Sequence, residues 1–192
     1  MIKPSSICVA ACVAAFLAGS LDLLRGQEFD LVIRNGKILD GTGKAAFAGD
    51  IAVKQGRIAR IGRFDGRGAS EIEAAGRVVA PGFIDVHTHS EPILELPVAE
   101  NFLRMGITTI VTGNCGFSPA PVEPRSAQLL QDSSELVRDR PLPFEWRTHR
   151  EFLDRLAAAP LALNVAHLAG HGSIRLAVMG DRFEPARDDD VA

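Results

Sequence analysis

Residues 77–89 read RVVAPGFIDVHTH, and this stretch decides which fold the chain can adopt. Its first ten residues are mostly apolar, which is typical of a strand that is buried on both faces of a sheet. The stretch then ends in two histidines separated by one threonine. Parallel α/β barrels carry their sites at the carboxyl ends of strands, so the place of these histidines indicates a functional site.

The histidine pair, His87 and His89, has a spacing that suits metal binding. Side chains two residues apart on a strand point to the same face, so both imidazoles can converge on one ion while Thr88 turns away. Neutral imidazole is a good ligand for zinc and related metals. A His-x-His pair also arises by chance, but its place at the end of an apolar strand favours the metal interpretation.

Cys115 follows a second strand-like run, residues 107–112, which is β-branched almost throughout. Gly113 and Gly116 lie on either side of it and indicate a tight loop rather than the centre of a packed strand. A thiolate in such a loop could join the two imidazoles as a ligand. These residues alone leave an alternative open, which is a buried free thiol that behaves as a small hydrophobe.

Longer motifs around these positions give the chain a family resemblance. They are residues 30–36 (DLVIRNG), 56–62 (GRIARIG), 81–89 (PGFIDVHTH), 106–109 (GITT), 113–121 (GNCGFSPAP), 164–166 (NVA) and 170–175 (GHGSIR). On these segments the sequence resembles the amidohydrolase superfamily, and within it the N-acyl-D-amino-acid deacylases, or D-aminoacylases. The resemblance runs from about residue 30 to about residue 180, and the cysteine-containing motif is its most specific part.

The resemblance implies zinc-dependent hydrolysis of the linear amide bond of N-acyl-D-amino acids. In that family the His-x-His pair serves one metal position and the cysteine the other, which assigns His87, His89 and Cys115 as ligands of one or two divalent ions. The remaining ligands are two histidines and an aspartate, which is also the general base. We expect those residues beyond Ala192, and we expect the 192-residue chain alone to be inactive.

Two further residues are candidates for contacts with the substrate or with the ligands. Glu91 stands near the place where deacylases show an aspartate. The alternative is that Glu91 does no more than organise the loop. His171 could face the substrate, and the alternative is a structural hydrogen bond that anchors its glycine-rich turn. His149 is expected to be solvated, because arginines and a threonine surround it in the sequence.

The sequence predicts three regions. Residues 1–20 resemble a secretory signal peptide cleaved near Ser20, because Lys3 precedes an apolar run that is too short to span a membrane. Export to a bacterial periplasm is therefore expected over a cytoplasmic location, with a buried helix or a disordered extension as the alternative. Residues 28–80 are expected to form the N-terminal part of a composite β-sandwich. Residues 81–192 are expected to form the N-terminal part of a (β/α)8 TIM barrel.

Within these regions the pattern predicts particular elements. Sandwich strands are expected at 29–38, 50–54, 56–61, 70–73 and 77–80. Barrel strands are expected at 82–89, 108–115 and 161–168, helices at 97–105 and within 146–159, and a proline-containing substrate loop at 116–144. A full barrel needs about 250 residues, so we expect an N-terminal part of a larger enzyme, or a truncated product.

Composition excludes some function classes and leaves others open. The net charge of −3 and the absence of a basic stripe argue against nucleic-acid binding. Cys8 and Cys12 would leave with the signal peptide, so Cys115 could form no disulfide within the mature segment. The expected partner is a small N-acyl amino acid. Alternatives are an amidohydrolase of cyclic amides, such as a hydantoinase or a dihydroorotase, and a non-catalytic truncated remnant.

Overall fold

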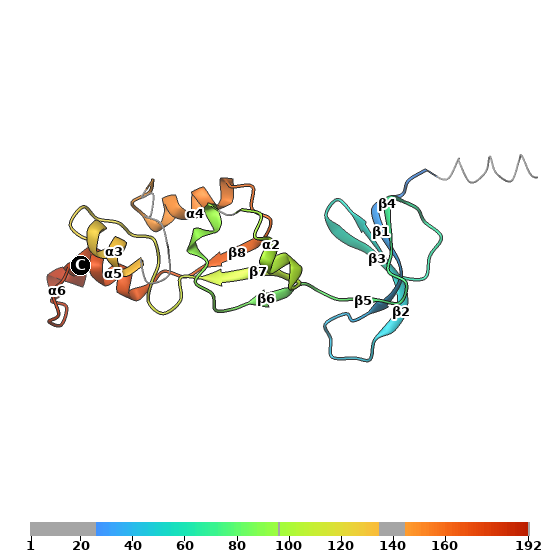
Figure 1. The fold of residues 1–192 in the computed structure, drawn as a ribbon, viewed down its shortest axis with the longest axis horizontal. Coiled ribbons are helices and arrows are strands. Elements are labelled where there is room, and N and C mark those ends of the chain that lie inside the picture. Colours follow the sequence, from blue (N-terminus) through green and yellow to red (C-terminus); the bar gives the residue numbers. More distant parts are fainter. Residues whose placement is uncertain (1–25, 96, 135–144, 192) are drawn as a thin grey trace, which may run out of the picture. The chain divides into compact units, whose positions relative to one another are not determined.

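The computed structural model describes residues 26–95, 97–134 and 145–191. The expected signal peptide, residues 1–20, lies outside the described residues. The chain divides into two compact units, Met1–Pro81 and Gly82–Ala192, which we call unit one and unit two (Figure 1). Because the boundary falls between the expected sandwich and barrel regions, each unit can be compared with its own prediction.

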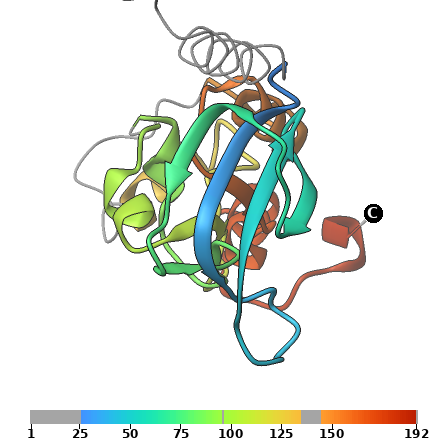
Figure 2. The same cartoon turned by 90° about the vertical axis from the view of Figure 1, so that its right-hand side faces the viewer.

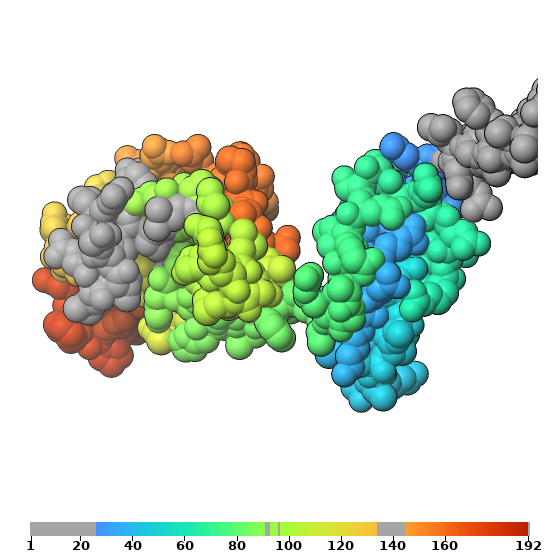
Figure 3. All heavy atoms as spheres, turned by 45° about the vertical axis from the view of Figure 1, so that its right-hand side comes forward, coloured from blue at the N-terminus to red at the C-terminus, as the bar shows by residue number. Residues whose placement is uncertain are grey.

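Unit one is a sheet built around its longest strand. Its strands are β1 (Phe29–Ile38), β2 (Phe47–Lys54), β3 (Arg57–Gly62), β4 (Gly68–Glu73) and β5 (Val78–Val79). The order is β3-β2-β1-β4, and β5 also pairs with β1. Figure 2 shows β1, in blue, running through the middle of the sheet, and its atoms lie between those of its neighbours in Figure 3. A second sheet, which the sandwich prediction requires, stays a prediction.

One face of this sheet is apolar. Cross-strand pairs place aliphatic side chains side by side on it, as in Ile33 with Ile51 and Ile51 with Ile61. We call this set the apolar face: Leu31, Ile33, Ile51, Val53, Ile58, Ile61 and Ile72. Ile58, Ile61 and Ile72 are 62%, 48% and 51% exposed, so within the described residues much of this face meets solvent.

The arginine Arg34 holds the opposite face together. It forms ion pairs with Asp50 at 3.5 Å and with Glu71 at 3.0 Å, and it donates hydrogen bonds to the carbonyls of Phe64 and Gly66. These contacts tie the loop between β3 and β4 to the central strand. The hydrogen bond from Arg34 lowers the pKa of the Glu71 carboxyl, which keeps that pair charged.

Unit two alternates strands and helices around a parallel sheet in the order β6-β7-β8. Its elements are β6 (Phe83–Asp85), the 3-10 helix η1 (Glu91–Leu94), α2 (Glu100–Arg104), β7 (Ile107–Thr112), α3 (Ala127–Ser134), α4 (His149–Ala158), β8 (Asn164–His167), α5 (His171–Met179) and α6 (Asp188–Val191). Parallel pairing with helical connections confirms the α/β fold class. A closed barrel stays a prediction.

The core of unit two lies between β7 and the helices. Ile110 of β7, Leu130 of α3 and Phe152 of α4 are almost fully buried, and Trp146 is 4% exposed. The Trp146 indole donates a hydrogen bond to the Pro119 carbonyl at 2.7 Å, which satisfies its buried N–H. The core therefore fixes the segment that follows the cysteine loop to the start of α4.

Three expectations about elements need correction. Residues 127–134 of the expected loop form α3, because Leu130 packs into the core and Ala127 packs against it, although prolines precede the helix. β6 ends at Asp85 and β7 at Thr112, so both strands stop before the histidines and the cysteine. The rest of the expected loop, residues 135–144, lies outside the described residues.

No helix in the described part of the chain is long and apolar enough to cross a membrane.

Candidate metal centre

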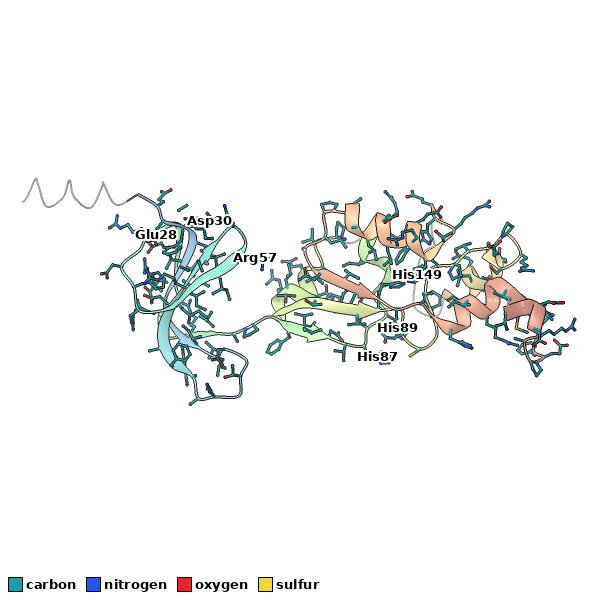
Figure 4. All side chains as sticks on the ribbon, turned by 180° about the vertical axis from the view of Figure 1, so that it is seen from behind. Glu28, Asp30, Arg57, His87, His89 and His149 are labelled. Atoms are coloured by element: carbon teal, nitrogen blue, oxygen red, sulfur yellow. The ribbon has the colours of Figure 1, made fainter. Side chains whose placement is uncertain are left out.

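The two histidines and the cysteine converge in the structure. One ligand atom from each of His87, His89 and Cys115 lies within 4.8 Å of the others. Nε2 of His87 is 3.3 Å from Sγ of Cys115, and the two imidazole ring centroids are 5.8 Å apart. Figure 4 shows both histidines beside the ends of the sheet strands. The structure therefore brings together the residues that the sequence predicted as ligands, and their role as ligands stays a prediction.

The histidines lie on a short loop, residues 86–90, which we call the first ligand loop. Strand alternation does not direct these two side chains, contrary to the prediction, because β6 ends before this loop begins. Hydrogen bonds hold the loop instead. The His87 amide donates to the Asp85 carboxylate at 3.1 Å, and the Thr88 amide donates to the Val111 carbonyl on β7 at 3.2 Å. The pair is therefore positioned by the neighbouring strand.

Cys115 lies on the second ligand loop, residues 113–118, in a left-handed backbone conformation. Its φ is 55°, and those of Gly113 and Gly116 are 81° and 79°. Residues other than glycine adopt this region rarely, and a run of such residues turns the chain sharply. This turn ends the strand at Thr112 and leaves the Cys115 side chain exposed beside the histidines.

Two buried serines fasten the second ligand loop to α5. The Ser118 amide donates to Ser173 Oγ, and Ser173 Oγ donates to the Ser118 carbonyl, both at 2.8 Å. The Gly170 amide donates to Ser118 Oγ at 3.0 Å, and the Ser173 amide donates to the Gly116 carbonyl at 3.1 Å. With both side chains almost completely buried, these bonds hold the cysteine loop in place.

The donor set fits a borderline metal such as zinc. Zinc and similar ions prefer nitrogen and sulfur ligands, such as imidazole and thiolate, over sites made only of oxygen ligands. Nδ1 of His89 is buried and has no hydrogen-bond partner among the described residues. A buried polar atom of this kind normally has a protein, water or metal partner. The residues present therefore fit the ion that the sequence predicts.

Among the described residues, the cluster of ligand atoms consists of His87, His89 and Cys115 and does not include His171. His171 begins α5, where its side chain is exposed. Glu91 begins η1, and its side chain lies outside the described residues. The structure tests neither candidate role. The Asp188–Val191 segment forms α6 with its three aspartates in the first turn, as a helix start rather than a ligand set.

The expectation that His149 is solvated is wrong. Its ring stacks on that of His167, with centroids 5.1 Å apart and planes at 25°, and its Nδ1 is buried without a partner in the described part of the chain. The reason lies in the register of α4, whose first residue faces the end of β8. The arginines near His149 in the sequence suggested a solvated helix face, but they do not indicate which way the His149 side chain points.

No role was predicted for His167, which is partly buried and forms a pair with the buried Thr112. Its Nδ1 is 2.6 Å from Thr112 Oγ1, and Phe152 packs edge-on against its ring. Burial, and then the nearby His149, lowers the pKa of His167 from 6.5 to about 4. The ring therefore stays neutral at physiological pH. The contacts with α4 mark it as a packing residue at the same strand ends as the metal centre.

Comparison with known proteins extends these observations. A model of the amidohydrolase family matches residues 70–191. The chain is 42% identical over 163 residues to the N-acyl-D-aspartate deacylase of Alcaligenes xylosoxydans xylosoxydans, covering 84% of this chain and 32% of that protein. The chain thus spans about a third of the length of the curated relatives it matches.

Solved structures give the same picture. A D-aminoacylase with a binuclear metal centre is similar with a TM-score of 0.74 and 35% identity, over 85% of this chain and 34% of that one. The N-acyl-D-glutamate deacylase of Bordetella bronchiseptica, complexed with zinc and a phosphonate mimic of the tetrahedral intermediate, is similar with a TM-score of 0.73 and 36% identity. That match covers 84% of this chain and 34% of the deacylase.

Proposed function

The chain belongs to the amidohydrolase family, and from this premise we propose that it provides the zinc-binding start of a hydrolase that removes the acyl group from N-acyl-D-amino acids. The observation that carries the proposal is the convergence of His87, His89 and Cys115. These residues lie within the region aligned with deacylases, of which one is described with zinc and another with two metal positions.

The chemistry follows from the donor set. A divalent ion held by these residues would supply Lewis-acid chemistry, lowering the pKa of a water toward about 7 and polarising the amide carbonyl of the substrate. The task of this chain is to hold the ligands in place. His87 and His89 would offer imidazole nitrogens and Cys115 its sulfur, and hydrogen bonds of the two loops to β7 and α5 hold the three groups together.

The metal site can be tested on the chain itself. We expect the purified chain to bind zinc, and Cys115→Ala and His89→Ala each to lower the affinity by at least tenfold, because each removes one direct ligand. Arg104→Ala, an exposed change on α2, serves as the control and should bind as the wild type does. Equal affinity in all four proteins would contradict the assignment. A wild-type chain that folds and binds no zinc would favour the non-catalytic alternative.

The substrate class needs a second experiment. In a hybrid enzyme, residues 26–191 of this chain would replace the aligned third of the Alcaligenes N-acyl-D-aspartate deacylase. We expect the hybrid to release acetate from N-acetyl-D-aspartate in preference to the L-enantiomer, and the same hybrid with Cys115→Ala to lose that activity. Turnover of hydantoin or dihydroorotate by the hybrid, without turnover of N-acetyl-D-aspartate, would contradict the proposal and support a cyclic-amide hydrolase.

We further propose that residues 1–20 direct export, on the sequence pattern alone. N-terminal sequencing of the protein recovered from the periplasm of a bacterial host is the test. An N-terminus near Leu21 is expected, whereas an intact Met1 in the cytoplasm would contradict it.

A further inference from the structure

Asn114 is the residue next to Cys115, yet its side chain points toward the histidines' loop rather than toward solvent. It is 9% exposed. Its Nδ2 donates to the Val111 carbonyl at 2.8 Å and to the Thr88 carbonyl at 3.3 Å. One side-chain amide therefore joins the second ligand loop to the end of β7 and to the first ligand loop.

Thr88 is the residue between the two histidines, and both its backbone amide and its backbone carbonyl form hydrogen bonds with residues in or just after β7. Its amide donates to the Val111 carbonyl at 3.2 Å, and its carbonyl accepts from Asn114. Its hydroxyl lies 2.7 Å from that of Ser90. Since His87 and His89 flank this fixed peptide, the direction of both imidazoles depends on bonds to the β7 side, of which Asn114 provides one.

The position of Asn114 also couples its side chain to the cysteine. Its backbone carbonyl accepts a hydrogen bond from the Phe117 amide at 3.0 Å, which closes the turn around Cys115. The backbone of Asn114 thus helps to shape the cysteine turn while its side chain holds the histidine loop. We propose that Asn114 is the positioning residue that sets the spacing between the thiol and the imidazole pair, and so the metal affinity of the site.

This inference rests on the proposed metal function and goes beyond it. Partners that orient metal ligands typically change metal affinity by 10–100-fold when they are removed. Asn114→Asp keeps the size of the side chain but loses both donated hydrogens, and it turns an oxygen toward two carbonyl oxygens. The direct ligands His87, His89 and Cys115 stay unchanged in this variant, so any loss of affinity reports their placement.

Asn164 offers a control in the same sheet, on the β7–β8 strand pair. Its Nδ2 donates to the Thr108 carbonyl at 3.1 Å, and its Cα pairs with that of Thr109. It therefore makes a comparable bond between β8 and β7, at the strand starts rather than at the strand ends. Asn164→Asp removes that bond without touching either ligand loop.

The test is cobalt(II) binding to the 192-residue chain and its two variants, measured by competition with a chelator and by the thiolate-to-cobalt charge-transfer absorption. We expect Asn114→Asp to bind at least tenfold more weakly with a changed absorption, and Asn164→Asp to match the wild type in both. Equal affinity and equal absorption in Asn114→Asp would overturn the inference and leave the proposed function intact.

Amide hydrogen exchange in the metal-free proteins separates the remaining outcomes. Asn114→Asp should lower the protection of the Thr88 amide by at least tenfold relative to wild type, and Asn164→Asp should not. If the wild type binds no cobalt but this difference is seen, the positioning role stands and the metal proposal falls. If Thr88 is equally protected in both variants and the wild type, Asn114 does not position the loop, and the inference is overturned.

Discussion

Cys115 shows how much a single residue depends on its surroundings. A left-handed conformation costs a residue other than glycine roughly 1–2 kcal/mol. The hydrogen bonds that Ser118 and Ser173 exchange offset such a cost, because each is buried and fully paired. The thiol therefore reaches the histidines through a backbone turn rather than through a flexible side chain.

A close approach at Gly170 supports the same turn. A β-carbon there would lie 2.5 Å from the Phe117 carbonyl carbon and 2.6 Å from the Gly116 oxygen. The backbone of Gly170, with φ −70° and ψ 119°, is open to any residue, so the restriction is steric alone. We expect Gly170→Ala to lower the free energy of unfolding by about 1–3 kcal/mol, as overpacking does.

Urea unfolding of Gly170→Ala beside the wild type measures this loss. Gly26→Ala is the control, because no atom lies within 4 Å of a β-carbon at that position. A Gly170→Ala protein as stable as the wild type would show that Gly170 and the second ligand loop can move apart at no cost in stability.

His167 predicts how stability depends on pH. Its pKa is about 4 in the folded chain and 6.5 when exposed, so below pH 6.5 the unfolded state takes up a proton that the folded state refuses. Stability should therefore fall as the pH drops from about 6.5 to about 4, and this contribution should be constant above pH 6.5. Because the pKa of His167 is about 4, its ring signals in proton NMR should not titrate between pH 5.5 and 8.

The variant His167→Asn provides the comparison. The difference in unfolding free energy between wild type and variant should shrink between about pH 6.5 and pH 4, because the variant has no imidazole to protonate. A ring that titrates near pH 6.5 would contradict the buried neutral state.

At the scale of elements, α4 has a complete start signal. The Thr148 hydroxyl accepts from the Glu151 amide at 3.2 Å, and the Glu151 carboxylate accepts from the Thr148 amide at 2.9 Å, which is a capping box. The Thr148 amide and the Arg147 amide both donate to the Glu151 carboxylate, and these two hydrogen bonds lower its pKa. The cap matters beyond the helix, because it fixes the first residue, His149, against His167.

We expect Thr148→Ala to destabilise unit two by about 1 kcal/mol, the usual cost of losing an N-cap. Thr148→Ser keeps the hydroxyl and should stay within a few tenths of a kcal/mol of the wild type. Thermal unfolding followed by circular dichroism measures both, and equal losses in the two variants would show that the methyl group rather than the hydrogen bond matters.

Sequence reasoning located most elements because their signals are local. The alternating run of β1 and the β-branched run of β7 are visible within a few residues, and β1 has the bounds that were expected. The convergence of His87, His89 and Cys115 was also accessible, because strand ends of a parallel sheet share one edge. What the sequence could not show depends on contacts across the fold.

The stack of His149 on His167 joins residues from a helix and a strand whose relative rotation is set by packing. The roles of Asn114 and Ser118 depend on which carbonyls and hydroxyls come within hydrogen-bond distance after folding. The motif GNCGFSP signalled that this loop is special, but not which of its polar groups bond to which neighbour. Such pairings are tertiary facts, and local propensity does not encode them.

At the scale of the whole chain, we expect the exposed part of the apolar face of unit one to influence behaviour in solution. Exposed apolar patches of this kind bind hydrophobic dyes and favour association. We expect the double change Ile61→Lys with Ile72→Lys to reduce dye fluorescence and self-association while leaving unit one folded, because both side chains are already about half exposed. Analytical ultracentrifugation of the two proteins is the measurement.

Lys37→Ala and Lys54→Ala, changes on β1 and β2 outside the apolar face, are the controls and should leave the dye signal unchanged. Equal sedimentation of wild type and double variant at high concentration would show that the apolar face does not drive association.

Unit one is amphipathic. One face of its sheet carries exposed aliphatic side chains, and the other carries the network of charges around Arg34. Its state in water then depends on concentration and on the salting-out strength of the buffer, since sulfate and phosphate strengthen the burial of apolar surface. Ammonium sulfate should precipitate the chain at a lower concentration when the apolar face is intact than when Ile61 and Ile72 are lysines. Air–water interfaces, as in a shaken tube, should collect it.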